Sequence, residues 1–481
     1  MNGKKKNIVL IVTDHQLYRN HSPLRPHYDE FSEDAVVFDN AYCSTPLCAP
    51  ARRSMLDGLY AHRHGNIYNQ SPAPFTEETY FPLLERAGYD NYTYGKWHSG
   101  PGTAYDLGVK GFSVPGYGTP YTTKEYRDYL EEMNLPYPGM EIIQTFPNPG
   151  TAKDFPGLVN GNPSYSPRGT WCGEQAIGIL KTPKETHEAF FLSHLASRQI
   201  EKLSSSEKPF HLSVHFWGPH QPYFPTKEYV DMYSGMKIGR YPSLDDDLAA
   251  KPGTYRHMNS PLSDENGNLR FPSVFSADEW EKFLKIAYAQ TTLIDDAIGM
   301  ILDSIRKNGL EDDTVVIITS DHGDALASHG GMFDKGSFLT EETVAVPFAV
   351  RIPGVKACHS PALISTIDWA PTILDIAGTR FSSPVDGESI LPVITGERES
   401  IRDRVLIESF GQGYRDRTKA FGYVDTSHMK FVVTENDIPE LYDLKSDPYE
   451  MKNLALGRDI SHERETLVRL CEKYGCDTSW M

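Results

Sequence analysis

Four runs of strand-forming residues, each ending abruptly in polar side chains, most constrain the fold of this 481-residue chain. The runs cover residues 7–12, 89–94, 210–216 and 314–318. Their near-continuous apolar character indicates strands buried on both faces, as in parallel α/β sheets. The carboxyl ends of parallel strands meet at one edge, where such sheets bind ligands. We therefore expect the polar clusters after the four runs to lie on one rim.

Helical patterns between these runs complete the predicted architecture. The clearest covers residues 287–307, where apolar side chains recur at helical spacing and Gly309 is placed to end the helix. Alternation of strand, helix and strand predicts an α/β fold. The expected form is a doubly wound, mostly parallel sheet with helices on both faces.

Other segments depart from this alternation. Residues 100–170 and 233–275 fit no strand–helix rhythm, and we expect ordered loops that shape a pocket above the rim. The acidic triplet Asp245–Asp247 is expected in a solvated loop. Short runs after residue 396 and a helix near 460–474 predict an α+β subdomain with antiparallel strands. The predicted division is a catalytic α/β domain at 1–395 and a C-terminal subdomain at 396–481.

Composition excludes some classes of partner and suggests a compartment. The formal net charge of −18 argues against nucleic acid or an anionic membrane as partner. The N-terminal apolar run is shorter than the roughly 7–15 residues of a signal-peptide core, and no run approaches the ~20 residues of a membrane span. The six scattered cysteines form no C-x-x-C pair and fit reduced thiols. We expect a cytoplasmic protein, and the sequence does not indicate its oligomeric state.

The segment around Cys48 is the most informative short motif. Pro50 and Arg52 follow it in a segment with helical character, and proline is tolerated in the first turn of a helix. Cys48 is therefore expected at a helix N-terminus, where the dipole favours an anionic ligand or a thiolate. Taken alone, the same residues describe a buried cysteine at the start of an ordinary helix.

The rim residues indicate a cation and an anionic ligand. Asp14, Asp321 and His322 follow two separate strands, and their convergence is costly unless a divalent metal joins them. A single aspartate at a strand end is more often a helix cap. Four further side chains would complement a tetrahedral oxyanion if they share the rim. They are Lys96, His98, His220 and Lys335.

At this point the residues resemble a known family. Five motifs occur in order: Cys48-Ala49-Pro50-Ala51-Arg52, Gly95-Lys96-Trp97-His98, Pro219-His220, Thr319-Ser320-Asp321-His322-Gly323 and Lys335. Together they resemble the motif set of the type I, formylglycine-dependent sulfatases of the alkaline phosphatase superfamily. Residues 294–299 and 440–448 are similar to stretches typical of the family, so the resemblance runs from about Asn7 to Asn453. It implies an alkaline-phosphatase-like version of the predicted fold.

The resemblance also implies a reaction, a sulfate monoester hydrolysis. A maturation enzyme would oxidise Cys48 to Cα-formylglycine, whose hydrate attacks sulfur in line and expels the alcohol. Collapse of the second hydroxyl would then release the sulfate. The substrate would be a small anion, either a sulfated sugar or an aryl or alkyl sulfate.

Each site residue has a role implied by the same resemblance. Asp14, Asp321, His322 and the modified Cys48 would coordinate one divalent metal, usually Ca²⁺ in this family, with Mn²⁺ or Mg²⁺ as alternatives. Arg52 would hold the hydrate, and Lys96 and Lys335 would neutralise sulfate oxygens. His98 would assist collapse of the second hydroxyl, while His220 would protonate the leaving alcohol.

Departures from the family pattern keep alternatives open. Many sulfatases have paired aspartates where this chain has Asp14-His15, and Asp-Asn where it has Asp321-His322. Added imidazoles favour Mn²⁺ over Ca²⁺. The Asp-His end also occurs in related phosphonate monoester and phosphodiester hydrolases, which are the second hypothesis.

The residues give less support to two further classes of protein. A non-catalytic binding protein on the same scaffold would have lost the nucleophile or the cations, and none is missing. A metal-only phosphatase would need more His and Asp ligands, and His15 is the only spare candidate. His15 itself fits a metal neighbour, a substrate contact or a strand-end residue. Tyrosines in 100–170 fit either sugar contacts or loop packing.

Overall fold

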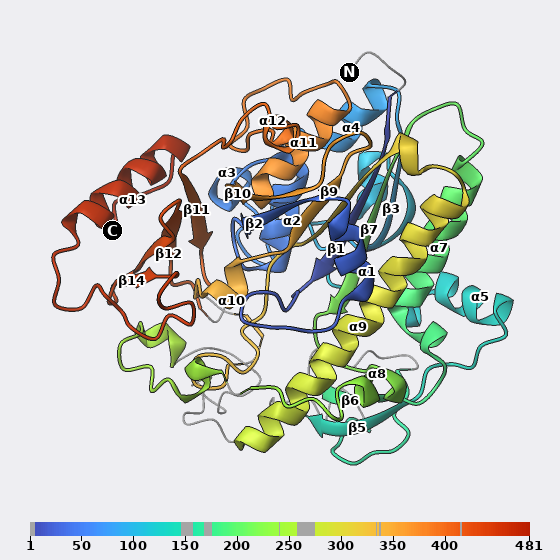
Figure 1. Cartoon of the computed structure of the whole chain (residues 1–481), viewed down its shortest axis with the longest axis horizontal. Helices are drawn as coiled ribbons and strands as arrows, with labels where there is room; N and C mark the ends of the chain where they lie inside the picture. The colour runs from blue at the N-terminus through green and yellow to red at the C-terminus, as the bar shows by residue number, and fades with distance from the viewer. Residues whose placement is uncertain are drawn as a thin grey trace.

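A large mixed sheet forms the centre of the molecule (Figure 1). The computed structural model describes residues 5–145, 157–167, 176–239, 241–256, 275–332, 334–335, 338–413 and 416–481. Within them, the sheet has eight strands: β1 (Asn7–Asp14), β2 (Val36–Tyr42), β3 (Asp90–Lys96), β4 (Lys110–Val114), β7 (Phe210–Pro219), β8 (Thr314–Ser320), β9 (Phe348–Arg351) and β10 (Cys358–Ser365). The α-helices are α1 (Pro26–Glu33), α2 (Cys48–Asp57), α3 (Ala61–His64), α4 (Tyr80–Arg86), α5 (Lys124–Glu132), α7 (Glu188–Leu203), α8 (Lys227–Met232), α9 (Ala277–Lys307), α10 (Glu341–Val344), α11 (Trp369–Ile376), α12 (Leu391–Ile394) and α13 (Ser461–Tyr474).

The strand order confirms the predicted mostly parallel sheet. It is β10-β2-β9-β8-β1-β7-β3-β4. β8, β1, β7, β3 and β4 pair in parallel, as do β10 and β2, while β9 runs antiparallel to both of its neighbours. All four predicted runs are therefore strands, and they lie side by side as β8, β1, β7 and β3. Their carboxyl ends form one edge.

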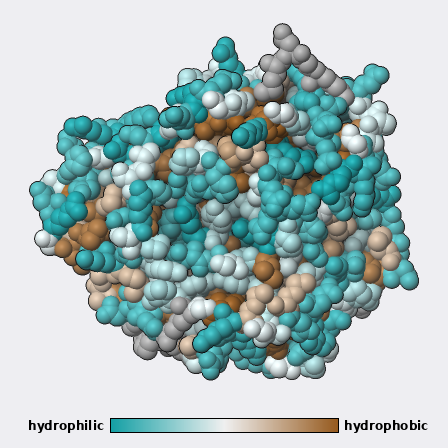
Figure 2. All heavy atoms as spheres, viewed as in Figure 1, coloured by the Kyte–Doolittle hydropathy of each residue, from teal (hydrophilic) through white to brown (hydrophobic). Residues whose placement is uncertain are grey.

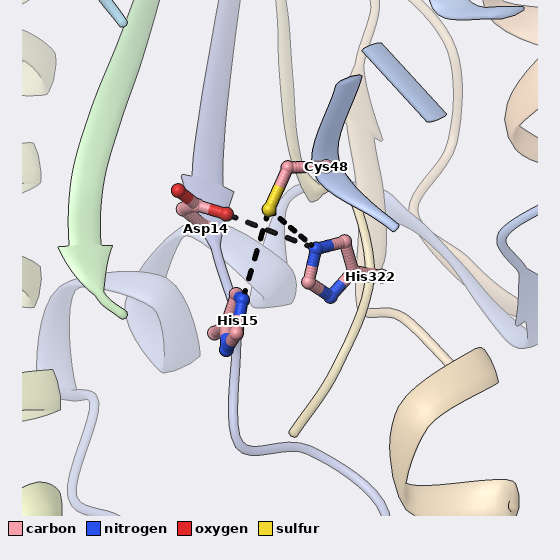
Figure 3. Close-up of side chains that lie close together, drawn as sticks. All are labelled: Asp14, His15, Cys48 and His322. Atoms are coloured by element: carbon pink, nitrogen blue, oxygen red, sulfur yellow. Dashed lines mark hydrogen bonds and ion pairs between the residues drawn. The ribbon is translucent and has the colours of Figure 1, made fainter. Parts of the chain in front are cut away.

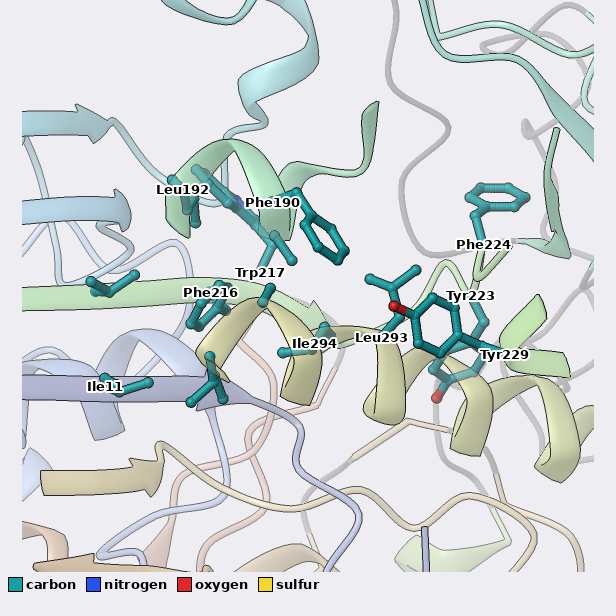
Figure 4. Packing of buried hydrophobic residues seen from close by; sticks show 14 of the residues in the cluster. Ile11, Phe190, Leu192, Phe216, Trp217, Tyr223, Phe224, Tyr229, Leu293 and Ile294 are labelled. Carbon is teal, nitrogen blue, oxygen red and sulfur yellow. The ribbon is translucent and has the colours of Figure 1, made fainter. Parts of the chain in front are cut away.

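β1 is buried on both faces, which explains its continuous apolar sequence. Ile8, Leu10 and Val12 belong to a core that also contains side chains of α2, α4 and α11. Val9 and Ile11 point to the other face, where the core is completed by α1, α7 and α9. Figure 4 shows this second core, with Phe216 of β7 packed between Ile11 and the helices. Helices thus cover both faces, as predicted.

The long helix α9 begins earlier than the sequence predicted. It starts at Ala277, not at 287, because Ser276 and Glu279 form a capping box. The Ser276 hydroxyl accepts from the Glu279 N–H at 3.3 Å, and the Glu279 carboxylate accepts from the Ser276 N–H at 2.8 Å. The end agrees with the prediction, since Gly309 has a positive φ of 66° just after the helix.

The prediction that residues 100–170 lack strand and helix is wrong. This segment contains β4, α5 and β5 (Met140–Thr145), and β5 pairs with β6 (Ala176–Leu180). β4 is an edge strand whose first two residues, Lys110 and Gly111, are exposed, so it needs no continuous apolar run. Residues 146–156 and 168–175, in and just after this segment, lie outside the described residues. Residues 257–274 of the second predicted loop do so as well.

The acidic triplet is only partly solvated. Asp245 and Asp247 are exposed as predicted, whereas Asp246 is buried. Asp246 accepts a hydrogen bond from the Leu248 N–H at 2.8 Å and lies 3.6 Å from Nδ1 of His329. This local turn and its histidine partner are not visible in a charge pattern.

The C-terminal part forms a second sheet. Its antiparallel strands are β11 (Arg404–Ser409), β12 (Ala420–Asp425), β13 (Met429–Thr434) and β14 (Glu440–Asp443). α13 packs on this sheet through Leu467 and Cys471, which confirms the predicted α+β arrangement. The boundary near residue 396 stays a prediction. On the face shown in Figure 2 the surface is largely hydrophilic, with apolar side chains in separate patches. Within the described ranges, no helix combines the length and apolarity that membrane crossing requires.

Candidate active site

The strand register brings the predicted rim residues together. Asp14, the last residue of β1, pairs with Pro219 of β7, and the preceding Thr13 pairs with Ser320 of β8. His220 and Asp321 follow directly, so both leave the sheet beside Asp14. Lys96 ends β3, the next strand along the same edge. A parallel sheet therefore gathers side chains that are more than 300 residues apart in sequence.

Cys48 faces this edge from the start of α2. Leu47 before it is extended, with φ −140° and ψ 127°, and Pro50 occupies the first turn, as predicted. The Cys48 sulfur lies 3.1 Å from Nε2 of His322 and 3.8 Å from Nε2 of His15 (Figure 3). His322 is held in this orientation because its Nδ1 donates to the Gly323 carbonyl at 2.8 Å.

The Cys48 side chain is a thiol in this environment. Burial raises the pKa of Cys48 to about 12, and the charge of Asp14 adds to that effect, while Lys335 and Lys96 oppose it. The thiolate that a helix N-terminus favours is therefore not stabilised here, because desolvation outweighs the dipole.

The donor set of the cluster fits a divalent metal. Ligand atoms of Asp14, His15, Cys48 and His322 all lie within 4.8 Å of one another. Asp14 Oδ1 is buried and has no hydrogen-bond partner among the described residues, which is costly for a carboxylate oxygen without a cation. Asp321 lies at the margin of this cluster, with its Oδ1 3.9 Å from Nε2 of His322. Carboxylate and imidazole donors suit Mn²⁺, Ca²⁺ or Mg²⁺ to different degrees.

Arg52 lies between the two aspartates. Its Nε donates to Asp321 Oδ2 at 2.8 Å, and its Nη2 lies 3.7 Å from Asp14 Oδ2. Burial alone would raise the pKa of Asp321, but Arg52, His322 and Lys96 together lower it to about 2. Both carboxylates are thus kept ionised although they are fully buried.

Two lysines add positive charge around Cys48. Lys96 forms an ion pair with Asp14 Oδ2, and its Nζ lies 4.3 Å from the ring centre of Tyr117. Lys335 contacts Nε2 of His15 and lies 3.1 Å from Asp334 Oδ1. Both lysine side chains are almost completely buried. The chain as a whole is negatively charged, but positive charge that can bind an anionic ligand is concentrated at this edge.

The two remaining predicted residues lie in the same site. His220 Nδ1 donates to the Gln221 carbonyl at 2.6 Å, and the His220 ring centre lies 3.8 Å from that of His15. Burial lowers the pKa of His220 well below its ordinary value, and Lys335 adds to this. His98 is buried with φ 37°, and burial followed by the charge of Lys96 lowers its pKa well below the ordinary value. All predicted site residues are thus brought to one edge of the sheet.

The sequence analysis gave no role to three neighbours of these residues, Asp324, Tyr117 and His215. His15 contacts Asp324 at 2.9 Å through Nδ1, so it is oriented by a carboxylate while Nε2 faces Cys48. The Tyr117 hydroxyl lies 3.4 Å from Nδ1 of His220, and His215 lies 3.2 Å from Arg52 Nη1. Asp324 follows the Asp321 motif closely, which is a usable signal. Tyr117 and His215 carry none, because one is among many tyrosines and the other lies within a strand.

Comparison with known proteins identifies the family. A family model for sulfatases matches residues 6–379, and a model for the C-terminal part of N-sulphoglucosamine sulphohydrolase matches residues 328–473. An N-acetylglucosamine-6-O-sulfatase of Bacteroides thetaiotaomicron is 26% identical and covers 98% of this chain and 86% of its own length. A choline-sulfatase of Rhizobium meliloti is also 26% identical and covers 95% of this chain and 83% of its own length.

Solved structures share the fold. A protein in complex with its substrate D-glucosamine-2-N,6-O-disulfate superposes with a TM-score of 0.71 at 19% identity, over 98% of this chain and 97% of its own. The phosphonate monoester hydrolase of Agrobacterium radiobacter superposes with a TM-score of 0.75 at 22% identity, over 98% and 96%.

The mostly parallel sheet, with a cysteine-bearing helix start and buried cations at its carboxyl edge, defines a hydrolase of the alkaline phosphatase superfamily. The chain belongs to the sulfatase family, the sulfuric ester hydrolases of that superfamily. Its substrate is accordingly a sulfuric ester, which is an anion. Members of this family generally use a formylglycine and a divalent metal.

Proposed function

We propose that the protein hydrolyses a sulfate monoester of a sugar, with residue 48 converted to formylglycine and one divalent metal beside it. The observation that carries the proposal is the contact of Cys48 with His322 at 3.1 Å, beside Asp14 Oδ1, which has no hydrogen-bond partner among the described residues, and beside buried cations. An unmodified Cys48 would be a poor nucleophile there, because burial disfavours the thiolate.

We propose that Asp14, Asp321, His322 and residue 48 hold the metal. Ca²⁺ is expected from the family, whereas the imidazoles of His322 and the neighbouring His15 favour Mn²⁺. Bound there, the metal and the aldehyde hydrate would together supply charge neutralisation and an oxygen nucleophile for the sulfur centre. Asp14 and Asp321 are already ionised and need no proton loss before they bind a cation.

The chain's other residues bind the anion and move protons. Lys96 contacts Asp14 and Lys335 contacts His15, and both would bind sulfate oxygens as fixed cations. Arg52 would orient the hydrate while it holds Asp321 in place. A bound anion would favour the protonated form of His220, which would then pass a proton to the leaving alcohol, and His98 would accept one from the hydrate. The burial of all these groups excludes water from competing hydrogen bonds.

A sugar is the substrate class that the relatives favour. Two of the relatives, from Bacteroides thetaiotaomicron and Homo sapiens, are named for N-acetylglucosamine 6-sulfate, and one structural neighbour holds a sulfated glucosamine. A choline-sulfatase of similar identity is the reason to test an alkyl sulfate beside the sugar.

Hydrolysis of a phosphonate monoester or phosphodiester is the second candidate. The Asp321-His322 end of β8 is the observation that favours it, because the related phosphonate hydrolases have the same pair. Purified protein should be assayed on N-acetylglucosamine 6-sulfate, choline sulfate, nitrophenyl sulfate, a phenyl phosphonate and a phosphodiester. We expect the sulfates to be turned over faster, and phosphonate turnover far above sulfate turnover would reverse the assignment.

Mass spectrometry tests the modification directly. Conversion of the Cys48 thiol to an aldehyde lowers the peptide mass by about 18 Da, whatever the substrate. Because a heterologous host can lack the maturation enzyme, the protein should be isolated from its source as well. Cys48→Ala should abolish turnover and keep the fold, whereas Cys358→Ala, which changes an exposed cysteine, should keep both. Residual activity in Cys48→Ala would contradict the mechanism. The cytoplasmic location stays a prediction.

A further inference from the structure

A second cluster of metal-ligating side chains lies apart from the active site, at the joint between the two sheets. His62 of α3, Glu408 of β11 and Cys476, which follows α13, have ligand atoms within 4.8 Å of one another. His62 Nδ1 lies 2.7 Å from Glu408 Oε2 and 3.7 Å from the Cys476 sulfur. His62 and Cys476 are 414 residues apart in the chain, and Glu408 lies between them in sequence.

The end of α13 fixes the cysteine. Gly475 ends the helix in the left-handed region with φ 77°, and the Cys476 N–H donates to the Cys471 carbonyl at 2.9 Å. This is a Schellman motif, in which the residues on either side of the turn pack together. It places the Cys476 thiol beside that of Cys471, and both cysteines are buried and free. The position of Cys476 is therefore set by backbone geometry.

The orientation of His62 is that of a metal ligand. Its Nε2 donates to the Tyr474 carbonyl at 3.0 Å, so Nδ1 is the nitrogen directed at Glu408. Metal-binding histidines characteristically donate their other ring N–H to a backbone carbonyl or carboxylate. Nε2 also lies 3.7 Å from the Cys476 sulfur, but its proton is donated to the carbonyl, so Nδ1 is the nitrogen that a metal between His62 and Glu408 would use.

The cluster also requires a positive charge. Glu408 is completely buried, and the groups in contact with its carboxylate oxygens are the His62 ring and the His62 N–H at 3.2 Å. Without a metal, that charge is carried by a protonated His62.

We propose that His62 Nδ1, Glu408 and the Cys476 sulfur form a binding site for Zn²⁺ that joins α3 to the C-terminal sheet and α13. The thiolate, imidazole and carboxylate donors are those of zinc, and Ca²⁺ and Mg²⁺ would select oxygen donors only. Tetrahedral zinc with bonds of about 2.1 Å to nitrogen and 2.3 Å to sulfur separates those atoms by about 3.5 Å. The sulfur now lies 3.7 Å from both ring nitrogens, so the Cys476 side chain would turn toward Nδ1 when the ion binds.

Zinc binding replaces two protons. One leaves Nδ1 of the protonated His62 and one leaves the Cys476 thiol, so the bound cation balances the two charges of Glu408 and the thiolate. The Glu408 carboxylate shifts slightly away from Nδ1 to admit the ion. The His62 side chain is 12% exposed, so a water molecule can complete the coordination.

Cobalt spectroscopy tests the site without any substrate. The background should be Cys48→Ala, because Cys48 offers a second thiol to added metal in the active site. After chelation and dialysis, Co²⁺ should give a thiolate-to-cobalt charge-transfer band at one equivalent, and Zn²⁺ should displace it. Adding Cys476→Ser or Glu408→Gln should abolish the band or weaken metal binding at least tenfold. Adding Cys358→Ser, a matched change of an exposed cysteine, should leave it intact.

Three results would overturn the proposal. These are no band in the Cys48→Ala protein, a band that persists unchanged with Cys476→Ser, and a Cys471–Cys476 disulfide in protein purified under reducing conditions. If Cys476→Ser does not fold, X-ray absorption of zinc-loaded Cys48→Ala protein replaces it. One sulfur neighbour at about 2.3 Å supports the site, and a zinc shell without sulfur contradicts it.

Discussion

At the scale of single residues, Arg52 shows how the site tolerates two buried carboxylates. Its guanidinium contacts Asp321 directly and lies 3.7 Å from Asp14, and all three side chains are almost completely buried. Removing one partner of such a group leaves a charge that is neither paired nor hydrated. A bound divalent cation would stabilise the same two carboxylates, so arginine and metal act on the same charges.

Arg52→Gln should therefore destabilise the protein in the presence of a chelator. We expect the free energy of unfolding to fall by about 3–5 kcal/mol, the usual cost of breaking a buried ion pair. Added Mn²⁺ or Ca²⁺ should restore more stability to the variant than to the parent protein. Urea unfolding with and without metal measures both effects. Arg469→Gln, on an exposed face of α13, should change stability by less than about 0.5 kcal/mol. Equal stability of the two variants in chelator would refute the charge-balance argument.

His15→Asp should change which metal the site prefers. The substitution replaces the imidazole, whose Nε2 now lies 3.8 Å from Cys48, with a shorter carboxylate at the same edge. Because hard oxygen donors favour Ca²⁺ and imidazole favours Mn²⁺, the ratio of Ca²⁺ to Mn²⁺ affinity should rise on the order of tenfold. Calorimetric titration of the metal-free variant and parent with each ion gives that ratio. An unchanged ratio would show that residue 15 does not ligate the metal.

At the scale of elements, what the sequence could predict depended on burial. β1, β7 and β8 were predictable because both faces are covered, which requires continuous apolar residues. β4 was missed because an edge strand tolerates Lys110 and Gly111, and the first turns of α9 were missed because their start depends on a capping box. Cys48, Asp14 and Asp321 were predictable as strand or helix ends. The contact of His15 with Asp324 depends on the path of a loop, which no periodicity encodes.

β7 contains a histidine that should make stability depend on pH. His211 is buried against Tyr80 and Phe81, and neither ring nitrogen has a hydrogen-bond partner among the described residues. Burial lowers the pKa of His211 to about 3. The unfolded chain takes up a proton on this ring below about pH 6.5, whereas the folded chain does so only below about pH 3. Folding stability is therefore lost as the pH falls from about 6.5 toward 3.

His211→Phe should remove this contribution. Between pH 8 and pH 5, the parent should lose about 2 kcal/mol more of its free energy of unfolding than the variant does. Phenylalanine can occupy a site lined by aromatic rings without needing a hydrogen bond. Urea unfolding curves of both proteins at the two pH values give the difference. The same pH dependence in variant and parent would mean that His211 is not the responsible group.

At the scale of the whole molecule, buried charges join the two sheets. Lys430 of β13 lies 2.7 Å from Glu450 and 3.7 Å from Glu341 of α10, and all three side chains are nearly inaccessible. The Glu341 N–H also donates to Glu450 at 3.0 Å. Ion pairs thus connect the C-terminal sheet to α10. Because these charged groups are buried, water cannot hydrate them in place of the ion pairs.

Lys430→Met should test that attachment. Loss of the ammonium removes the nearest cation of Glu450 and leaves Glu341 with Arg19, 3.6 Å away, so we expect a destabilisation of about 3–5 kcal/mol. Lys445→Met, which changes an exposed lysine nearby, should stay within about 0.5 kcal/mol of the parent. Differential scanning calorimetry shows whether both sheets still unfold together. A variant as stable as the parent would show that Lys430 is not needed to join them.

The order of the central strands has a consequence for the time at which Cys48 can be modified. β1 is flanked by β7 and β8, so its edges stay open until residues 210–219 and then 314–320 have left the ribosome. Once they pair, Cys48 is 1% exposed and in contact with His15 and His322, which follow β1 and β8. Any enzyme that oxidises Cys48 must therefore work on a nascent or still unfolded chain. The fraction of modified protein would then depend on the rate at which that enzyme oxidises Cys48 relative to the rate at which the sheet forms.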